Sequence, residues 1–149
     1  MKPLPLLLIN TISFIITLFI NYLGGSGVYF GKSVGDISDD FTTLITPAAY
    51  AFSIWGLIYL SLISFLIYQW VGYFKKQNDT SLVPAGIWFT VANLSNALWI
   101  YVWVNEQILL SVIVILVLLF SLIQLVLRLR LEIYDAPLKT IFFVWCAFI

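Results

Sequence analysis

The sequence predicts an all-α membrane protein, a bundle of transmembrane helices with four full spans and the start of a fifth. Hydrophobic residues make up 62% of the 149 residues, whereas charged residues make up only 9%. A soluble domain needs about a quarter of its residues charged to keep its surface hydrated. The seven basic and seven acidic residues lie between the apolar runs, as expected where a charge at mid-bilayer costs about 2.5–3.5 kcal/mol.

Four apolar runs approach or exceed the length of about 20 helical residues that crosses a hydrocarbon core of about 30 Å. They predict spans at residues 4–23, 47–73, 87–104 and 108–127 within a single domain, 1–149. Thr46 and Pro47 favour a helix start, because a hydroxyl can cap a helix and proline is tolerated at its first position. Residues 140–149 are too few to span, so we expect a fragment whose fifth helix is cut short.

The basic residues predict the orientation of the bundle. All but one of the seven fall on one side of the four spans, and only Lys32 falls on the other. Because basic residues accumulate on the cytoplasmic side, this distribution places the N-terminus in the cytoplasm and residues 24–45 outside.

Two interpretations of the 24–45 connection remain open. Phe30, Val34, Ile37 and Phe41 recur at helical spacing, which favours a short amphipathic helix on the membrane or over a pocket mouth. Two glycines interrupt this pattern and favour a solvated acidic loop. The aspartates of this segment, Asp36, Asp39 and Asp40, lack the glycine and the distal glutamate of a calcium loop, so we expect no metal site.

The residue inventory limits the chemistry. The chain has no histidine and one cysteine, Cys146, which excludes Ser-His and Cys-His catalysis and an intrachain disulfide. The spans hold no titratable group apart from tyrosines and Cys146, so acid–base catalysis has little support. We predict no catalytic residue, no metal and no resident cofactor, and the absence of a basic excess argues against a nucleic acid partner.

The third span carries the clearest candidate binding surface. Trp88, Asn96, Trp99 and Trp103 fall within one arc of roughly 80° when each residue advances by about 100°. Indoles offer flat stacking area and an amide can orient a ligand by a hydrogen bond, so this stripe predicts a surface for a flat, largely apolar ligand. The alternative is that Asn96 satisfies a buried backbone group.

The first span carries a polar stripe of Asn10, Ser13, Thr17 and Asn21. Amides in hydrocarbon need partners, so this face should point into the bundle. One interpretation is helix–helix contact, in which each hydrogen bond contributes roughly 0.6–2 kcal/mol. The other is the polar wall of a pocket.

Residues 46–59 resemble the second-helix signature of the TspO/translocator proteins, also called tryptophan-rich sensory proteins. Pro47, Trp55 and Tyr59 match that signature in spacing, although its first proline is Thr46 here. The segment Asn96-Ala97-Leu98-Trp99 resembles the Asn-x-x-Trp motif of the third helix. The resemblance covers residues 41–149 and is closest to a longer bacterial branch. It implies a five-helix bundle in the bacterial inner membrane, often a homodimer, with a pocket under the first loop.

Members of that family bind tetrapyrroles such as protoporphyrin, and some bind sterols. We therefore expect a membrane-embedded receptor or transporter-type protein for a hydrophobic planar ligand, rather than an enzyme. Two alternatives stay open: light- or oxygen-dependent porphyrin breakdown, and a structural or regulatory partner of other membrane proteins through the polar stripe of the first span. The resemblance and the stripes together give the candidate ligand-binding residues Trp55, Asn96, Trp99, Phe52, Tyr59 and Trp103.

Overall fold

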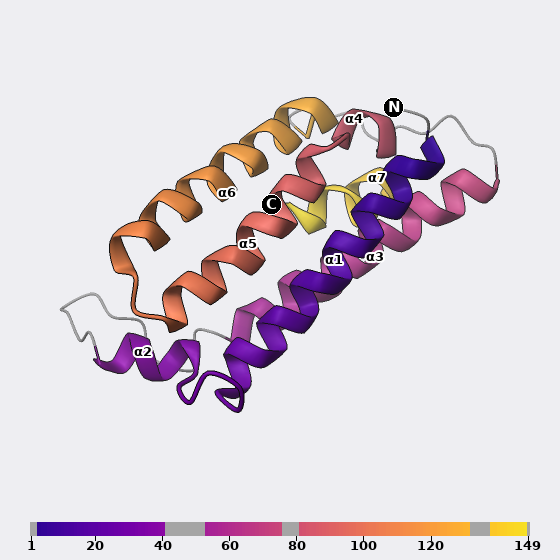
Figure 1. The fold of residues 1–149 in the computed structure, drawn as a ribbon. Coiled ribbons are helices and arrows are strands. Elements are labelled where there is room, and N and C mark those ends of the chain that lie inside the picture. The colour runs from indigo at the N-terminus through magenta and orange to yellow at the C-terminus, as the bar shows by residue number, and fades with distance from the viewer. Residues whose placement is uncertain (1–2, 41–52, 76–80, 132–137, 149) are drawn as a thin grey trace.

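The computed structural model describes residues 3–40, 53–75, 81–131 and 138–148. Four long helices run side by side along one axis (Figure 1). They are α1 (Pro3–Ser26), α3 (Ile54–Phe74), α5 (Trp88–Val104) and α6 (Ile108–Leu129). By length and composition, α1, α3 and α6 could each cross a membrane, whereas α5 is shorter, at 17 residues. The part of the chain that is described contains no strand.

Short elements close the two ends of the bundle. At one end lies α2 (Val34–Asp40), and at the other lies α4 (Leu82–Ala85) (Figure 1). The described chain ends in α7 (Leu138–Phe143) and a 3₁₀ turn, η2 (Trp145–Ala147), which pack against α3. Gly86, with a φ of 55°, stops α4, because the left-handed region favours glycine.

Helices α5 and α6 lie within two residues of the apolar runs 87–104 and 108–127, for which the sequence predicts spans. The first helix runs three residues further than expected, to Ser26. For the second span, the described helix begins at Ile54, and residues 47–52 lie outside the described residues. The stretch 140–149 differs from the expectation of one incomplete helix, because α7 ends at Phe143 and η2 follows.

A tight turn joins α5 to α6 and makes them the antiparallel hairpin that the short 105–107 connection predicts. Glu106 adopts a positive φ of 59°, and its amide donates to the Trp103 carbonyl at 2.9 Å. The Gln107 amide donates to the Val102 carbonyl at 3.1 Å. The turn thus satisfies the last carbonyls of α5 and returns the chain along it.

The polar stripe of α1 pairs with α5 inside the bundle. Asn10 accepts a hydrogen bond from the Thr90 hydroxyl at 2.7 Å. The Thr17 hydroxyl donates to the Asn93 carbonyl at 2.8 Å, and the Asn93 side chain donates to Ser13 at 3.3 Å. All these α1 residues are buried. The helix–helix interpretation therefore holds for Asn10, Ser13 and Thr17.

Aromatic rings fill the core where α1, α3, α5 and the last described residues meet. Phe65 is fully buried and packs edge-on against Phe148, with ring centroids 4.9 Å apart. Phe89 lies 5.3 Å from Phe65 and 6.2 Å from Phe14. This cluster fixes the C-terminal segment against α3 and α5.

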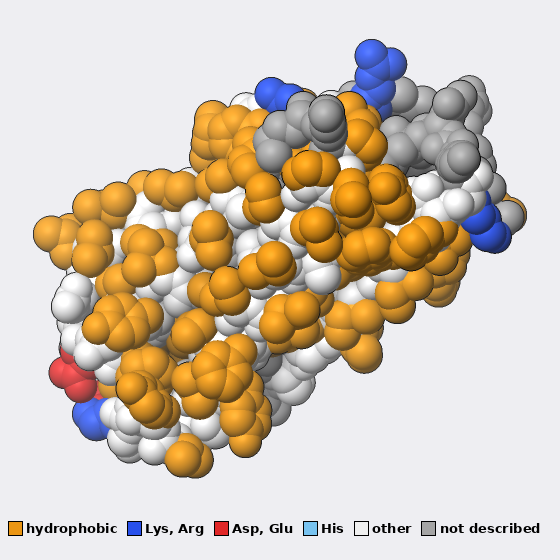
Figure 2. Space-filling model, turned by 45° about the vertical axis from the view of Figure 1, so that its right-hand side comes forward, with side chains coloured by type: hydrophobic (Ala, Val, Ile, Leu, Met, Phe, Trp, Pro, Cys, Tyr) orange, Lys and Arg blue, Asp and Glu red, His pale blue; other side chains and the backbone are white. Residues whose placement is uncertain are grey.

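The outer surface is that of helices in a bilayer. Hydrophobic side chains cover the face shown in Figure 2, and charged side chains gather at its two ends. Much of α6 is exposed and aliphatic, as expected for a lipid-facing scaffold. The face of α6 that meets α5 buries Ser111 and Ser121, whose hydroxyls donate to backbone carbonyls of their own helix.

Candidate functional site

Two cavities lie between the helices and share a wall made by Trp55 and Tyr59 of α3. We call them the α2 cavity, of about 560 Å³, and the α6 cavity, of about 580 Å³. Both volumes lie within the range of about 300–1,000 Å³ typical of small-molecule pockets. Besides the shared wall, the α2 cavity is lined chiefly by Leu18, Asn21, Asp36, Asp39 and Trp99. The α6 cavity is lined chiefly by Phe89, Asn96, Leu118, Leu122 and Phe148.

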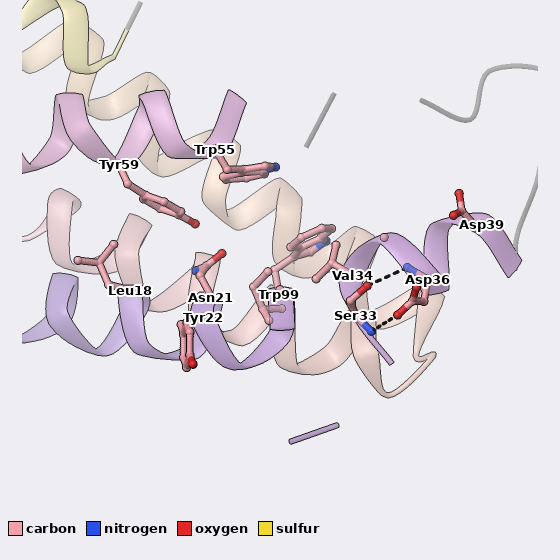
Figure 3. A pocket seen from close by; sticks show the side chains of 13 residues that line it. Leu18, Asn21, Tyr22, Ser33, Val34, Asp36, Asp39, Trp55, Tyr59 and Trp99 are labelled. Atoms are coloured by element: carbon pink, nitrogen blue, oxygen red, sulfur yellow. Dashed lines mark hydrogen bonds between the residues drawn. The ribbon is translucent and has the colours of Figure 1, made fainter. Parts of the chain in front are cut away.

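Helix α2 lines one end of the α2 cavity, and reciprocal hydrogen bonds cap its first turn. The Ser33 amide donates to the Asp36 carboxylate at 2.7 Å, and the Asp36 amide donates to the Ser33 hydroxyl at 3.1 Å (Figure 3). This reciprocal cap satisfies two amides that a helix start would otherwise leave unpaired. Ile37 is fully buried. The amphipathic-helix interpretation of the 24–45 connection is thus confirmed over residues 34–40.

Two further contacts attach this segment to α5 and to the α5–α6 turn. The Trp103 indole N–H donates to the Val34 carbonyl at 3.2 Å. The Lys32 ammonium lies 2.7 Å from Asp40 and 3.1 Å from Glu106. These ion pairs are half exposed, and exposed pairs contribute about 0–1 kcal/mol. The buried face of α2 and the indole hydrogen bond therefore contribute most of the attachment.

Three tryptophans stack beside the α2 cavity. The rings of Trp55 and Trp99 are 6.5 Å apart with planes inclined by 19°. Trp103 lies behind Trp99, 5.5 Å away and inclined by 20°. Trp55 also packs on Tyr59 at 6.0 Å. The stack joins α3 to α5 and presents a flat aromatic wall to the cavity, as Figure 3 shows for Trp55 and Trp99.

The α6 cavity has no charged residue among the described residues that line it. Asn96 accepts a hydrogen bond from Asn21 at 2.7 Å, and its own amide nitrogen has no partner in the described part of the chain. The Tyr59 hydroxyl is buried and likewise makes no hydrogen bond to the described residues. An unmade hydrogen bond of this kind costs about 1–3 kcal/mol. The cavity therefore offers a donor amide and a hydroxyl to a ligand that carries matching polar atoms.

The structure brings together most of the residues that the sequence proposed. Trp55 and Tyr59 line both cavities, Asn96 lines the α6 cavity, and Trp99 lines the α2 cavity. Phe52 lies outside the described residues.

Two tryptophans of the α5 stripe lie elsewhere. Trp103 lines neither cavity and instead supports Trp99 and α2. Trp88 packs edge-on against Phe120 of α6 at 5.5 Å, and the Arg128 guanidinium lies 5.8 Å from its ring centroid. Trp88 therefore lines neither the α2 cavity nor the α6 cavity, although it shares the arc of the α5 stripe.

Three further polar residues belong to the site. At Asn21 the pocket-wall interpretation of the α1 stripe holds, because Asn21 lines the α2 cavity and donates a hydrogen bond to Asn96 of the α6 cavity. Asp36 and Asp39 appeared only as acidic residues of a loop, yet both line the α2 cavity. The helical spacing of residues 30–41 predicts the helix that carries Asp36 and Asp39, but it does not predict that the two carboxylates line a cavity.

Comparison with known proteins identifies one family. The sequence model of the family described as TSPO-like protein matches residues 7–149. No curated protein matches the chain, and no solved structure matches it.

Proposed function

Because the chain belongs to the TSPO-like protein family and is an integral membrane protein, we propose that it is a receptor or transporter-type protein for a hydrophobic planar ligand. We propose a tetrapyrrole such as protoporphyrin as that ligand. The observation that carries the proposal is the α6 cavity. Its described lining residues are uncharged, and they include Asn96 and Tyr59, whose hydroxyl has no hydrogen-bond partner among the described residues.

The α6 cavity suits a flat apolar ring better than the α2 cavity does. Protoporphyrin carries two carboxylates, and in the α2 cavity these would meet Asp36 and Asp39. In the α6 cavity the ring would contact Trp55 and Phe148, and polar edge atoms would reach Tyr59 and Asn96. Several lining residues, Leu57 and Leu122 among them, are exposed on the bundle surface, which offers a route from the bilayer.

A protoporphyrin titration of the purified protein in a non-ionic detergent tests the proposal, with quenching of tryptophan fluorescence as the signal. Tyr59→Phe removes one hydroxyl without changing the ring, and we expect about 2- to 10-fold weaker binding, the equivalent of one hydrogen bond. Tyr101→Phe is the matched control, because Tyr101 is exposed and lines neither cavity. We expect that variant to bind within about twofold of the unmodified protein.

Linear quenching that is identical in all three proteins would mean that porphyrin only partitions into micelles, and it would refute the proposal. Parallel absorbance spectra in darkness and in light separate binding from breakdown. A loss of the porphyrin absorbance band in light that disappears when Trp55 or Trp99 is replaced would favour an enzyme over a receptor.

The membrane location is part of the same proposal. We propose a bacterial inner-membrane protein with a cytoplasmic N-terminus, as the distribution of basic residues predicts, and a homodimer, as the family resemblance implies. Accessibility of single introduced cysteines on either side of the membrane tests the orientation, with Cys146 first replaced by serine. Light scattering of the detergent complex tests the dimer.

A further inference from the structure

The α4 end of the bundle carries positive charge. Among the described residues, Lys75 follows the last residue of α3, Arg128 lies in the last turn of α6, and Arg130 follows the last residue of α6. All three side chains are exposed, whereas the described acidic residues lie at the opposite end, on α2 and in the α5–α6 turn. In Figure 2, Lys and Arg side chains are visible at the end of the hydrophobic surface opposite the Asp and Glu side chains. Because the apolar helices end here, these charges lie at the level of the lipid headgroups.

Arg128 lies beside an aromatic ring at this end. Its guanidinium is 5.8 Å from the centroid of the Trp88 ring, which is a cation–π distance. The guanidinium makes no hydrogen bond or ion pair with another described residue. The ring therefore positions the guanidinium and leaves its N–H donors available to a ligand. Guanidinium donors match the oxygens of a phosphate group, which they can bind in pairs.

Two uncharged donors lie next to this guanidinium. Trp88 is the first residue of α5 and is half-buried, and its indole N–H makes no hydrogen bond in the described part of the chain. Gln124 lies one turn before Arg128 on the same face of α6, and its half-buried amide also makes no hydrogen bond there. Donors of this kind at the membrane interface favour a ligand that is anionic and rich in acceptor oxygens.

An apolar surface continues from these donors toward the middle of the bundle. Phe120 lies two turns before Arg128 on α6, about 12 Å along the helix axis, and Trp88 packs edge-on against it at 5.5 Å. Phe120 is 52% exposed, and its neighbours Ile123 and Leu127 are exposed as well. A molecule whose anionic group binds Arg128 can therefore lay an apolar chain along α6. An anionic phospholipid combines these two parts.

We propose that the surface where the start of α5 meets the end of α6 binds an anionic phospholipid. The phosphate would accept hydrogen bonds from Arg128 and Trp88, and an acyl chain would lie along Phe120. A zwitterionic lipid suits this surface less well, because its ammonium group would meet the positive charge of the α4 end. The inference goes beyond the tetrapyrrole proposal, because these residues line neither the α2 cavity nor the α6 cavity.

Native mass spectrometry of the purified chain in an uncharged detergent tests the selection. The chain is titrated with phosphatidylglycerol and with phosphatidylcholine of identical acyl chains, and the dissociation constant of the first bound lipid is measured for each. We expect phosphatidylglycerol to bind about fivefold more tightly, the equivalent of one basic residue at the membrane surface. A large excess of glycerol phosphate, which lacks the acyl chains, should not displace it.

Variants of the two contact residues locate the preference. Arg128→Gln removes the charge but keeps a long polar side chain, and it should bring the two lipids within about twofold of each other. Trp88→Phe removes the indole N–H, and it should weaken binding of phosphatidylglycerol about 2- to 5-fold. Arg130→Gln is the matched control, because it removes the same charge at the same end and Arg130 makes no cation–π contact with Trp88. The control should keep the preference to within about twofold, and circular dichroism confirms that each variant is folded.

Three results would overturn the inference. Equal affinity of the unmodified chain for the two lipids would show a surface without headgroup selection. Equal losses in Arg128→Gln and Arg130→Gln would show a general field at this end rather than a site. Displacement of the lipid by glycerol phosphate would show a site for soluble anions. None of these results bears on the protoporphyrin titration, so the two proposals fail independently.

Discussion

Replacing Gly24 by alanine probes the closest approach of α1 to α5. A methyl group at this position would fall well inside the ordinary contact distance of Cγ2 of Ile100, a buried and β-branched residue with little freedom to move. Overpacking of this kind costs about 1–3 kcal/mol. Alanine in place of glycine within a helix returns about 0.5–1 kcal/mol. The expected net effect is a loss of about 0–2.5 kcal/mol in the free energy of unfolding.

The neighbouring glycine supplies the matched control. A methyl group on Gly25 would meet nothing within 4 Å, so Gly25→Ala should gain about 0.5–1 kcal/mol from helix propensity alone. Unfolding by sodium dodecyl sulfate from mixed micelles, followed by circular dichroism, measures both variants on one scale. Equal effects of the two substitutions, or a stabilised Gly24→Ala, would refute the close packing of α1 on Ile100.

Three more predictions concern hydrogen bonds of the site. A double-mutant cycle with Asn21→Ala and Asn96→Ala should give a coupling of about 0.6–1.7 kcal/mol in the same unfolding titration, and strictly additive effects would contradict the bond between them. Trp103→Phe removes the indole donor to the Val34 carbonyl, so amide hydrogen exchange in residues 34–40 should become about 2- to 10-fold faster. An unchanged exchange rate would show that this hydrogen bond does not stabilise α2. Since the pKa of Asp36 is lowered in the folded state, its contribution to α2 is complete above the ordinary carboxyl value of 3.8 and is lost as the pH falls through the lower folded value. Protection of α2 should therefore decrease below about pH 4, and Asp36→Asn should not show this decrease.

The long helices of this protein could be predicted because the hydrocarbon core of a bilayer sets the length of a helix that crosses it. An apolar run that nearly spans the bilayer has few alternatives to a helix, and the runs at 87–104 and 108–127 became α5 and α6 with small shifts. The short helix α2 could be anticipated from a different signal, the helical spacing that buries Ile37. The polar stripe of α1 indicated that this face is buried. It did not identify α5 as the helix that receives it, because spacing within one helix carries no information about its neighbours.

The stripe on α5 shows that the angular position of a residue around its helix does not alone predict what its side chain contacts. Trp88 and Trp99 share an arc of the helix, yet they are eleven residues apart, which separates them by about 16 Å along the axis. Trp88 packs against Phe120 of α6, whereas Trp99, further along the helix axis, stacks on Trp55 of α3. Position along the helix therefore decides whether an aromatic side chain fills the core or lines a cavity. The resemblance implied a pocket under the first loop, where the α2 cavity lies. Helix periodicity could not predict the α6 cavity, because it is a volume that the packed helices leave unfilled.

The common wall of the two cavities has a thermodynamic consequence. Trp55 and Tyr59 face both spaces, and the hydrogen bond from Asn21 to Asn96 joins a residue of one cavity to a residue of the other. A ligand that shifts this wall from one side alters the free energy of binding on the other side. Linkage requires the two effects to be equal, so each ligand changes the affinity of the other by the same factor. A bundle with this partition can report the concentration of one compound through the occupancy of a second.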